Sequence, residues 1–202
     1  MKSSYPPFNK YDYYLKAVQS PETDVEFLRD TYRELRKKNP QILCEDFCGT
    51  FAICCEWVKL NKEFRAIGID LDTEPLNYGY EKHLSRLTQE QRQRVKIKNE
   101  NVLSGKISRA DIVVAMNFSY YIFKERHLLL EYFKKSRERL RSNGLFIIDG
   151  FGGPSCMLAN EEITEHKGFN YYWDQDSFDP ITNYAKFYIH FKRRGEKKRE
   201  KV

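Results

Sequence analysis

The sequence lacks the long apolar segments that would mark a membrane protein or a secreted precursor. No run approaches the roughly 20 apolar residues that a membrane-spanning helix needs, and residues 1–7 contain no apolar stretch of the signal-peptide type. Five cysteines are present, an odd number, and four of them fall in one apolar stretch between residues 44 and 55. A disulfide framework is therefore not favoured, and we expect a soluble protein of the cytoplasm.

Glycine-rich phosphate loops and metal-ligand spacings are also absent. No G-x-x-x-x-G-K-[S/T] sequence of a P-loop occurs, and the G-x-G-x-x-G arrangement that holds a dinucleotide pyrophosphate is missing after the first expected strand. The cysteines lack the paired C-x-x-C spacing of a zinc site, and the four histidines match no catalytic or ligand pattern. We therefore expect no metal, and the cysteines are interpreted as buried structural thiols.

What the sequence does contain is typical of one soluble domain. Of 202 residues, 41% are hydrophobic and 15% are aromatic, enough for a sizeable core. The formal charge is +6, but residues 192–202 alone hold seven Lys or Arg against two Glu. The rest of the chain has 28 basic and 27 acidic residues, a net charge of +1. Any attraction for a polyanion is therefore confined to the C-terminal tail.

Apolar runs and helical periodicities alternate along the middle of the chain. We expect strands at 41–45, 64–70, 95–97, 111–116 and 145–149, and helices at 11–20, 21–38, 50–60, 73–93 and 124–141. Continuous apolar strands separated by helices predict a parallel sheet that is covered on both faces. The expected fold class is therefore α/β, with a doubly wound, mostly parallel sheet preceded by N-terminal helices.

The alternation stops after residue 150. A turn at 152–154 and a short helical piece precede two alternating segments, 171–174 and 184–192, which predict an antiparallel hairpin joined around Asp179-Pro180. We therefore expect three parts. They are an N-terminal helical cap (1–40), a sheet core (41–150), and a substrate-side helix and β-hairpin with the basic tail (151–202).

Two acids and one glycine stand where the first two expected strands end. Ligands of doubly wound sheets bind beyond the carboxyl ends of the strands, near a switch point. Glu45 ends the first strand, Gly49 lies in the turn after it, and Asp70 ends the second strand. An acid at the position of Asp70 can accept both ribose hydroxyls of a nucleoside. A nucleoside with no phosphate to hold, but with an ammonium for Glu45 to influence, describes S-adenosylmethionine.

Four short motifs make residues 41–150 resemble the cofactor-binding core of class I S-adenosylmethionine-dependent methyltransferases. They are E-D-F-C-G-T-F at 45–51, G-I-D-L-D at 68–72, N-E-N-V at 99–102 and A-M-N-F-S-Y-Y at 115–121, in the family's order and at strand ends. The similarity extends to a bacterial-type subgroup with a Tyr-rich N-terminal helix and an A-V-Q-S-P segment before the first strand. The resemblance implies a Rossmann-like methyltransferase sheet and S-adenosylmethionine as the cofactor.

The resemblance also implies a role for each matching position. Glu45 acts on the methionine ammonium, and the backbone of Cys48 and Gly49 lies beside the methionine portion. Asp70 holds the ribose, and Leu71 lies beside the adenine. The other cofactor-binding positions are Asn101 and Val102 at the adenine edge, Asn117 and Phe118 beside the transferable methyl, Phe47 in the first turn, and Tyr14 in the N-terminal helix.

Two features of the sequence depart from the family's pattern. Phe47 and Phe51 stand where the pattern has glycine, and Asn101 replaces its frequent Asp. Phe47 must therefore point away from the ligand or pack on it.

The implied reaction needs little covalent help from the protein. Methyl transfer from a sulfonium is an in-line displacement, and orientation alone can supply effective molarities on the order of 10⁵ M. A general base is needed only if the acceptor arrives protonated. The candidate catalytic residues are Asn117, Tyr120 and Tyr121, while Tyr11 and Tyr14 are further aromatic residues that could face the sulfonium.

A small-molecule acceptor is the favoured substrate. Asn117 is followed by Phe-Ser and not by the Pro-Pro-aromatic sequence associated with methylation of planar base nitrogens. Two other functions stay open: an NAD(P)-dependent oxidoreductase, which the missing glycines disfavour, and a non-catalytic nucleic-acid-binding module that uses the basic tail. Plainer structural roles also stay open, a helix cap at Asp70 and a turn cap at Asn117.

The expected hairpin has two interpretations. The complete class I fold has seven strands, and segments 171–174 and 184–192 could be its last two, beside the fifth strand. The W-D-Q-D…F-D-P-I-T-N segment instead resembles a hairpin that the subgroup inserts over its active site. We favour this second interpretation, on which the final strands are missing, the chain stops inside a strand at 197–202, and the fifth strand keeps an open edge.

Overall fold

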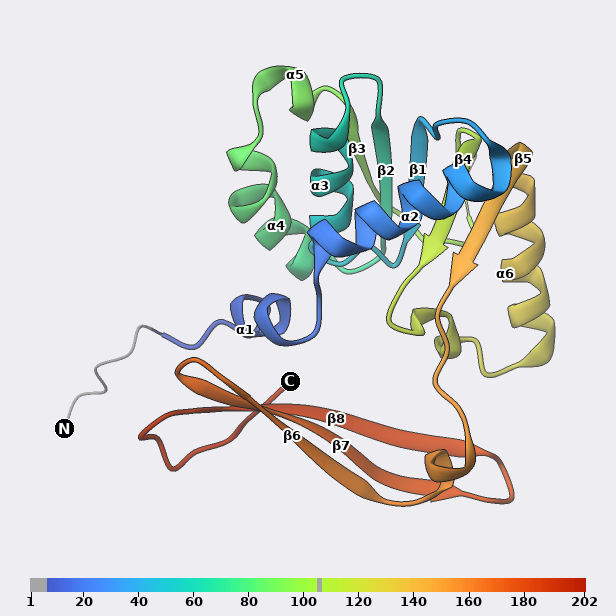
Figure 1. Cartoon of the computed structure of the whole chain (residues 1–202). Helices are drawn as coiled ribbons and strands as arrows, with labels where there is room; N and C mark the ends of the chain where they lie inside the picture. The colour runs from blue at the N-terminus through green and yellow to red at the C-terminus, as the bar shows by residue number, and fades with distance from the viewer. Residues whose placement is uncertain (1–6, 105–106) are drawn as a thin grey trace. The chain divides into compact units, whose positions relative to one another are not determined.

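The computed structural model describes residues 7–104 and 107–202, so residues 1–6 of the expected N-terminal cap lie outside it. The chain forms two compact units (Figure 1). The larger unit comprises residues 20–150, and the smaller unit joins the N-terminal residues up to 19 with residues 151–202. The two N-terminal helices therefore belong to different units.

Five parallel strands form the sheet of the larger unit, in the order β3-β2-β1-β4-β5. Their bounds are Ile42–Asp46 (β1), Arg65–Asp70 (β2), Val95–Asn99 (β3), Ala110–Ala115 (β4) and Leu140–Ile148 (β5). Every residue of β4 is buried, as a central strand covered on both faces requires. The expected doubly wound α/β fold is confirmed.

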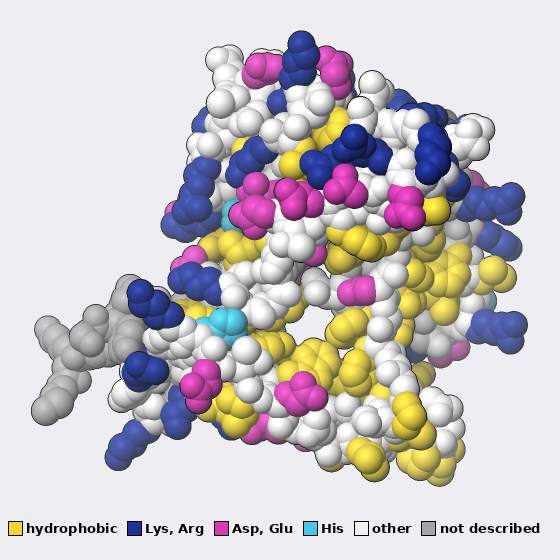
Figure 2. Space-filling model, viewed as in Figure 1, with side chains coloured by type: hydrophobic (Ala, Val, Ile, Leu, Met, Phe, Trp, Pro, Cys, Tyr) yellow, Lys and Arg dark blue, Asp and Glu magenta, His cyan; other side chains and the backbone are white. Residues whose placement is uncertain are grey.

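Helices cover both faces of this sheet (Figure 1). They are α2 (Pro21–Arg36), α3 (Ala52–Leu60), α4 (Thr73–Lys82), α5 (Gln89–Arg92) and α6 (Arg126–Glu138), with 3-10 turns η1 (Leu84–Arg86) and η2 (Ser119–Ile122). One core lies under α2, α3 and α4, and it includes Leu28, Trp57 and Leu76. The other lies under α6 and is centred on Tyr132. Charged side chains are interspersed over the outer surface where α2 runs (Figure 2).

The single helix expected over 73–93 is in fact three pieces, α4, η1 and α5. Thr88 starts α5 with a capping box, in which its hydroxyl accepts the Gln91 N–H at 3.2 Å and the Gln91 side chain accepts the Thr88 N–H at 3.0 Å. The T-x-x-Q signature of this cap was present in the sequence. A cap inside a helical pattern starts a new helix, which explains the difference.

The smaller unit has a four-stranded antiparallel sheet in the order β6-β7-β8-β9, together with α1 (Lys10–Ala17) and the 3-10 turn η3 (Pro154–Met157). Its strands are β6 (Asn160–His166), β7 (Phe169–Asp179), β8 (Tyr184–Arg193) and β9 (Glu200–Lys201). Strands β7 and β8 are the expected hairpin, and β9 lies within the strand expected at 197–202, but β6 was not expected. The Tyr13 ring of α1 packs edge-on against Phe169, with 4.8 Å between ring centroids.

The hairpin does not extend the parallel sheet. Strands β7 and β8 pair with each other and with β6 and β9, and in the described part of the chain β5 has β4 as its only ladder partner. The interpretation that placed the hairpin beside the fifth strand is therefore wrong. Part of the basic tail is folded: Arg199 pairs with Glu161 at 2.7 and 3.0 Å and stacks over the Tyr172 ring. Within the described residues, no helix has the length and apolar character needed to cross a bilayer.

Candidate cofactor site

The candidate site lies at the carboxyl edge of the parallel sheet, where the strand order reverses. Strand β1 lies between β2 and β4, so the chain leaves β1 toward one side of the sheet and returns to it as β4 on the other. This switch point is where doubly wound sheets bind ligands.

The turn after β1 is built from left-handed backbone. Phe47, Gly49 and Phe51 have φ angles of +54°, +52° and +47°. The Cys48 N–H donates to the Ile69 carbonyl at 3.0 Å, which ties the turn to β2. Phe51 is fully buried, and α4 approaches it so closely that a Cβ at Gly79 would collide with its ring. Left-handed backbone at Phe51 and the missing Cβ at Gly79 explain how a large side chain fits at this position.

Two backbone hydrogen bonds hold the Asp70 carboxylate in place and leave some of its lone pairs unused. Its Oδ2 accepts the Gly49 N–H at 2.7 Å, and its Oδ1 accepts the Asp72 N–H at 2.9 Å. A carboxylate can accept about four hydrogen bonds, so two positions stay available for a ligand. The N-cap of α4 is Asp72, whose side chain accepts the Glu74 N–H at 2.9 Å. The alternative role of Asp70 as the helix cap is therefore wrong.

Glu45 is buried beneath the turn, with 3% of its surface exposed. Its Oε2 accepts a hydrogen bond from the Cys54 thiol at 3.0 Å. Burial raises the pKa of Glu45 to about 8, opposed by the Cys54 hydrogen bonds and reinforced by the charges of Asp24 and Asp70. The carboxyl group is thus close to its midpoint at mildly alkaline pH.

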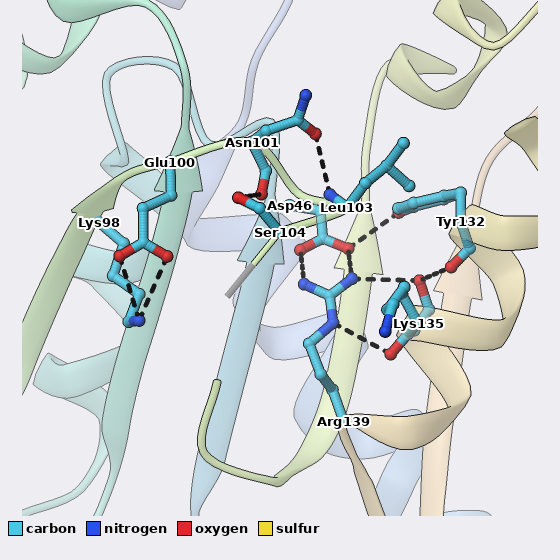
Figure 3. A network of polar contacts seen from close by, with 10 residues as sticks. Asp46, Lys98, Glu100, Asn101, Leu103, Ser104, Tyr132, Lys135 and Arg139 are labelled. Atoms are coloured by element: carbon cyan, nitrogen blue, oxygen red, sulfur yellow. Dashed lines mark hydrogen bonds and ion pairs between the residues drawn. The ribbon is translucent and has the colours of Figure 1, made fainter. Parts of the chain in front are cut away.

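A cavity of about 320 Å³ opens at the ends of β2 and β3. It is lined by Phe47, Asp70, Leu71, Asp72, Glu100, Asn101, Val102, Ile122 and Phe123. The rings of Phe47 and Phe123 lie 6.0 Å apart between centroids. Figure 3 shows Asn101 at this edge, where its Oδ1 accepts the Leu103 N–H at 2.9 Å. The cavity therefore combines apolar walls with carboxylate and amide groups, as a nucleoside would require.

The second acid of the first motif faces the other side of the sheet. Asp46 forms a bidentate pair with Arg139 of α6 at 2.6 and 2.7 Å, and it accepts the Tyr132 hydroxyl at 2.9 Å (Figure 3). Both charged side chains are almost fully buried. Asp46 is thus committed to fixing α6 on the sheet.

The loop after β4 is anchored by Asp149, a residue that sequence reasoning missed. Asn117 and Phe118 are left-handed, with φ angles of +56° and +42°. Their N–H groups donate to the two oxygens of the Asp149 carboxylate at 2.8 and 2.6 Å. Tyr120 follows in η2, and burial together with the hydrogen bond between Tyr120 and its neighbour Tyr121 raises the pKa of Tyr120 to about 12.

No protein-family model matches the sequence, and no curated protein matches it. Solved structures do match. A S-adenosylmethionine-dependent methyltransferase from Clostridium acetobutylicum ATCC 824 is 19% identical, with a TM-score of 0.71 over 95% of this chain and 75% of that chain. A sugar N-methyltransferase from Streptoalloteichus sp ATCC 53650 is 16% identical, with a TM-score of 0.67 over 100% of this chain and 80% of that chain.

A third match is an amino pentose methyltransferase from Micromonospora echinaspora, whose structure has S-adenosylmethionine bound and which is involved in calicheamicin biosynthesis. It is 11% identical, with a TM-score of 0.72 over 99% of this chain and 81% of that chain. The chain has the class I methyltransferase fold.

Within this methyltransferase fold, the expected cofactor-binding and catalytic residues fall into four groups. Five of them line one cavity: Phe47, Asp70, Leu71, Asn101 and Val102. Glu45, Cys48 and Gly49 form the end of β1 and the turn beneath it, while Asn117, Phe118, Tyr120 and Tyr121 form the loop after β4. Tyr14 lies on α1, in the smaller unit.

Four cavity residues were not singled out from the sequence. Asp72 and Glu100 are inside the G-I-D-L-D and N-E-N-V motifs, so the motifs themselves could have indicated them. Ile122 and Phe123 carry no signal of their own and are found only once the methyltransferase fold places η2.

The cysteines of the methyltransferase fold are packing residues. Cys44, Cys48, Cys54 and Cys55 are free and buried, and burial raises the pKa of Cys55 to about 12. The Cys48 and Cys54 sulfur atoms lie over Gly68, where a Cβ would be 2.9 and 3.2 Å from them. Among the described residues, no three potential ligands gather into a metal site.

Proposed function

We propose that the chain is an S-adenosylmethionine-dependent methyltransferase that acts on a small-molecule acceptor. The observation that carries this proposal is the cavity at the switch point, in which Asp70 offers free acceptor positions beside apolar walls. Its chemistry matches a nucleoside whose ribose hydroxyls need an acceptor and whose base needs apolar faces.

The charge of the cavity favours a cationic nucleoside over a nucleotide. Three carboxylates line it, those of Asp70, Asp72 and Glu100, and no Lys or Arg is among its described lining residues. Lys98 lies 3.4 Å from Glu100 and offsets part of that charge. A pyrophosphate would meet carboxylates at close range, whereas a sulfonium and an ammonium would be attracted. This supports S-adenosylmethionine and disfavours NAD(P).

The chain's own residues fit that cofactor part by part. Asp70 would accept the ribose hydroxyls, and the Phe47 and Phe123 rings would contact the base, whose edge Asn101 would meet. Glu45 attracts the methionine ammonium from beneath the turn. The bound cofactor supplies a methyl group on a positively charged sulfur.

The protein's part in the reaction is positioning. Asn117 and Phe118 hold their loop next to the methyl, and Tyr120 and Tyr121 extend it as candidate contacts of the acceptor. Holding the acceptor in line with the methyl and keeping water out can supply much of the rate enhancement. With its raised pKa, Tyr120 is protonated at neutral pH and can donate a hydrogen bond.

Two observations support a small-molecule acceptor. The loop after β4 reads Asn-Phe-Ser, without the Pro-Pro-aromatic sequence associated with base methylation. Two of the structures that share the fold are those of a sugar N-methyltransferase and an amino pentose methyltransferase. Neither a sugar nor any other acceptor is assigned to this chain.

Isothermal calorimetry tests the proposal directly. We expect S-adenosylmethionine and S-adenosylhomocysteine to bind at micromolar concentrations, and NADH to give no heat. If neither sulfur compound gives heat or a thermal shift, the proposal is refuted. Binding of NADH alone would favour an oxidoreductase. A salt-dependent RNA shift that disappears on removal of residues 192–202 would instead favour a nucleic-acid-binding module.

A further inference from the structure

We infer that Asp149 is a positioning residue that holds the loop bordering the transferable methyl. This inference rests on the proposed function, because the methyl is placed there only if S-adenosylmethionine binds at the switch point. The geometry behind it does not depend on a ligand. Asp149 follows directly after β5, and its carboxylate accepts the N–H groups of Asn117 and Phe118 at 2.8 and 2.6 Å.

The anchored backbone is in a conformation that it would not adopt readily alone. Asn117 and Phe118 are two successive non-glycine residues with positive φ, and for an aromatic residue such as Phe118 this conformation is uncommon. Left-handed backbone of this kind persists where surrounding interactions over-determine it. Hydrogen bonds to an ionised carboxylate are roughly twice as strong as neutral ones, so Asp149 supplies the interaction that holds both residues.

The register of the sheet explains why Asp149 can reach this loop. Ala115, the last residue of β4, pairs with Ile148, the last residue of β5. Asp149, the residue after Ile148, therefore lies beside the turn that follows Ala115. Both oxygens of the Asp149 carboxylate thus reach backbone N–H groups of this loop.

The anchored turn also fixes the position of the residues that follow it in η2. The Tyr121 N–H donates to the Phe118 carbonyl at 2.9 Å, and the Ser119 hydroxyl donates to the Met116 carbonyl at 2.7 Å. A change at Asp149 would thus be passed along η2 to Tyr120 and Tyr121. We therefore expect a substitution of Asp149 to weaken binding of the methyl-bearing cofactor and to leave binding of its nucleoside part almost unchanged.

The chain offers a matched control at the opposite end of the same sheet. Asp111 also accepts two backbone N–H groups, those of Gln41 and Ile42, both at 2.9 Å. It stands at the start of β4, whereas the site lies beyond the end of β4. Asp111→Asn therefore removes a comparable carboxylate without touching the loop.

The experiment measures binding of three probes, S-adenosylmethionine, S-adenosylhomocysteine and adenosine, to wild-type protein, Asp149→Asn, Asp149→Glu and Asp111→Asn. We expect Asp149→Asn and Asp149→Glu to weaken S-adenosylmethionine by about tenfold, the effect of losing one good charge-assisted hydrogen bond, and adenosine by less than about threefold. Asp111→Asn should weaken all three probes by less than about threefold.

Asp149→Glu separates positioning from charge, because it keeps the carboxylate but moves it by one methylene. If it binds S-adenosylmethionine as the wild type does, the carboxylate acts through its charge and the positioning role is overturned. A parallel loss for all three probes, or no loss, would also overturn it.

Amide hydrogen exchange in the wild-type protein keeps the inference testable if the Asp149 variants do not fold. We expect the Asn117 and Phe118 amides to exchange at least about a hundredfold more slowly than in an unstructured chain. Unprotected amides would refute the anchor. If the wild type binds no sulfur compound while these amides are protected, the proposed function fails and the anchor stands.

Discussion

If S-adenosylmethionine binds as proposed, the ionisation of Glu45 should make the affinity for the cofactor depend on pH. Glu45 is buried beneath the first turn, faced by the Cys54 thiol from α3 and influenced by Asp24 on α2 and Asp70 on β2. Burial raises its pKa to about 8, so at pH 7 the carboxyl group is mostly protonated. Only the ionised form attracts the methionine ammonium, so binding must first remove this proton.

The size of the effect follows from the ionised fraction. With a pKa of about 8, that fraction is roughly 1% at pH 6, roughly 9% at pH 7 and roughly 50% at pH 8. S-adenosylhomocysteine should therefore bind about ninefold more tightly at pH 7 than at pH 6, and about fivefold more tightly again at pH 8.

The stability of the unliganded protein should change in the opposite direction. The pKa of Glu45 rises from 4.5 to about 8 on folding, so the folded state holds this proton more tightly. Its contribution is fully present below pH 4.5 and is lost as the pH rises to about 8, by as much as about 5 kcal/mol. The free energy of unfolding should thus fall over this range while the thermal shift caused by the ligand grows.

Calorimetry at pH 6, 7 and 8 tests the prediction with Glu45→Gln and with adenosine as controls. Glutamine can still accept the Cys54 hydrogen bond but cannot ionise, and adenosine has no ammonium. Both should give affinities that do not change with pH. A wild-type affinity for S-adenosylhomocysteine that is flat over this range would refute the reasoning, as would a pH dependence that survives in Glu45→Gln.

Three further pairs of variants probe single contacts. Asp70→Asn should weaken S-adenosylhomocysteine by about 10- to 100-fold, whereas Asp72→Ala, which removes the N-cap of α4, should mainly lower the free energy of unfolding by about 1 kcal/mol. Arg139→Met leaves Asp46 buried and unpaired and should cost about 3–5 kcal/mol in urea unfolding. The exposed pair of Arg29 and Asp30 gives the control, since Arg29→Met should cost about 1 kcal/mol or less. Gly79→Ala drives a Cβ into Thr50 and Phe51 and should cost about 1–3 kcal/mol, whereas Gly152→Ala meets open space and should not. Equal effects in either matched pair would contradict the packing described.

The parallel sheet could be predicted because its signals are local. The strand expected at 64–70 is observed at Arg65–Asp70, and the one expected at 111–116 at Ala110–Ala115. Both are continuous apolar runs bounded by polar residues, the pattern of a strand buried on both faces. The five cavity residues that were expected belong to motifs at the ends of β1, β2 and β3.

Elements that depend on contacts with distant parts of the chain could not be predicted from local patterns. Strand β6 has one large apolar residue, Ile163, and it is mostly exposed, so no alternation marks it. It forms because β7 offers an edge to pair with. Strand β5 begins at Leu140, directly after α6, although a helix was expected through Arg141. The pair between Arg139 and the distant Asp46 holds α6 at this junction, and no local pattern reveals it.

The adjacent acids Glu45 and Asp46 show why a motif alone does not assign a site. Successive side chains of a strand point to opposite faces of the sheet, so these two neighbours enter different cores. Glu45 meets Cys54 of α3, while Asp46 meets Tyr132 and Arg139 of α6. Asp46 has a buried cationic partner, whereas the hydrogen bonds of Glu45 come from Cys54, which is uncharged. In the described part of the chain, Glu45 is thus a buried acid with no counter-ion in contact with it, and an ammonium is a group that would pair with it.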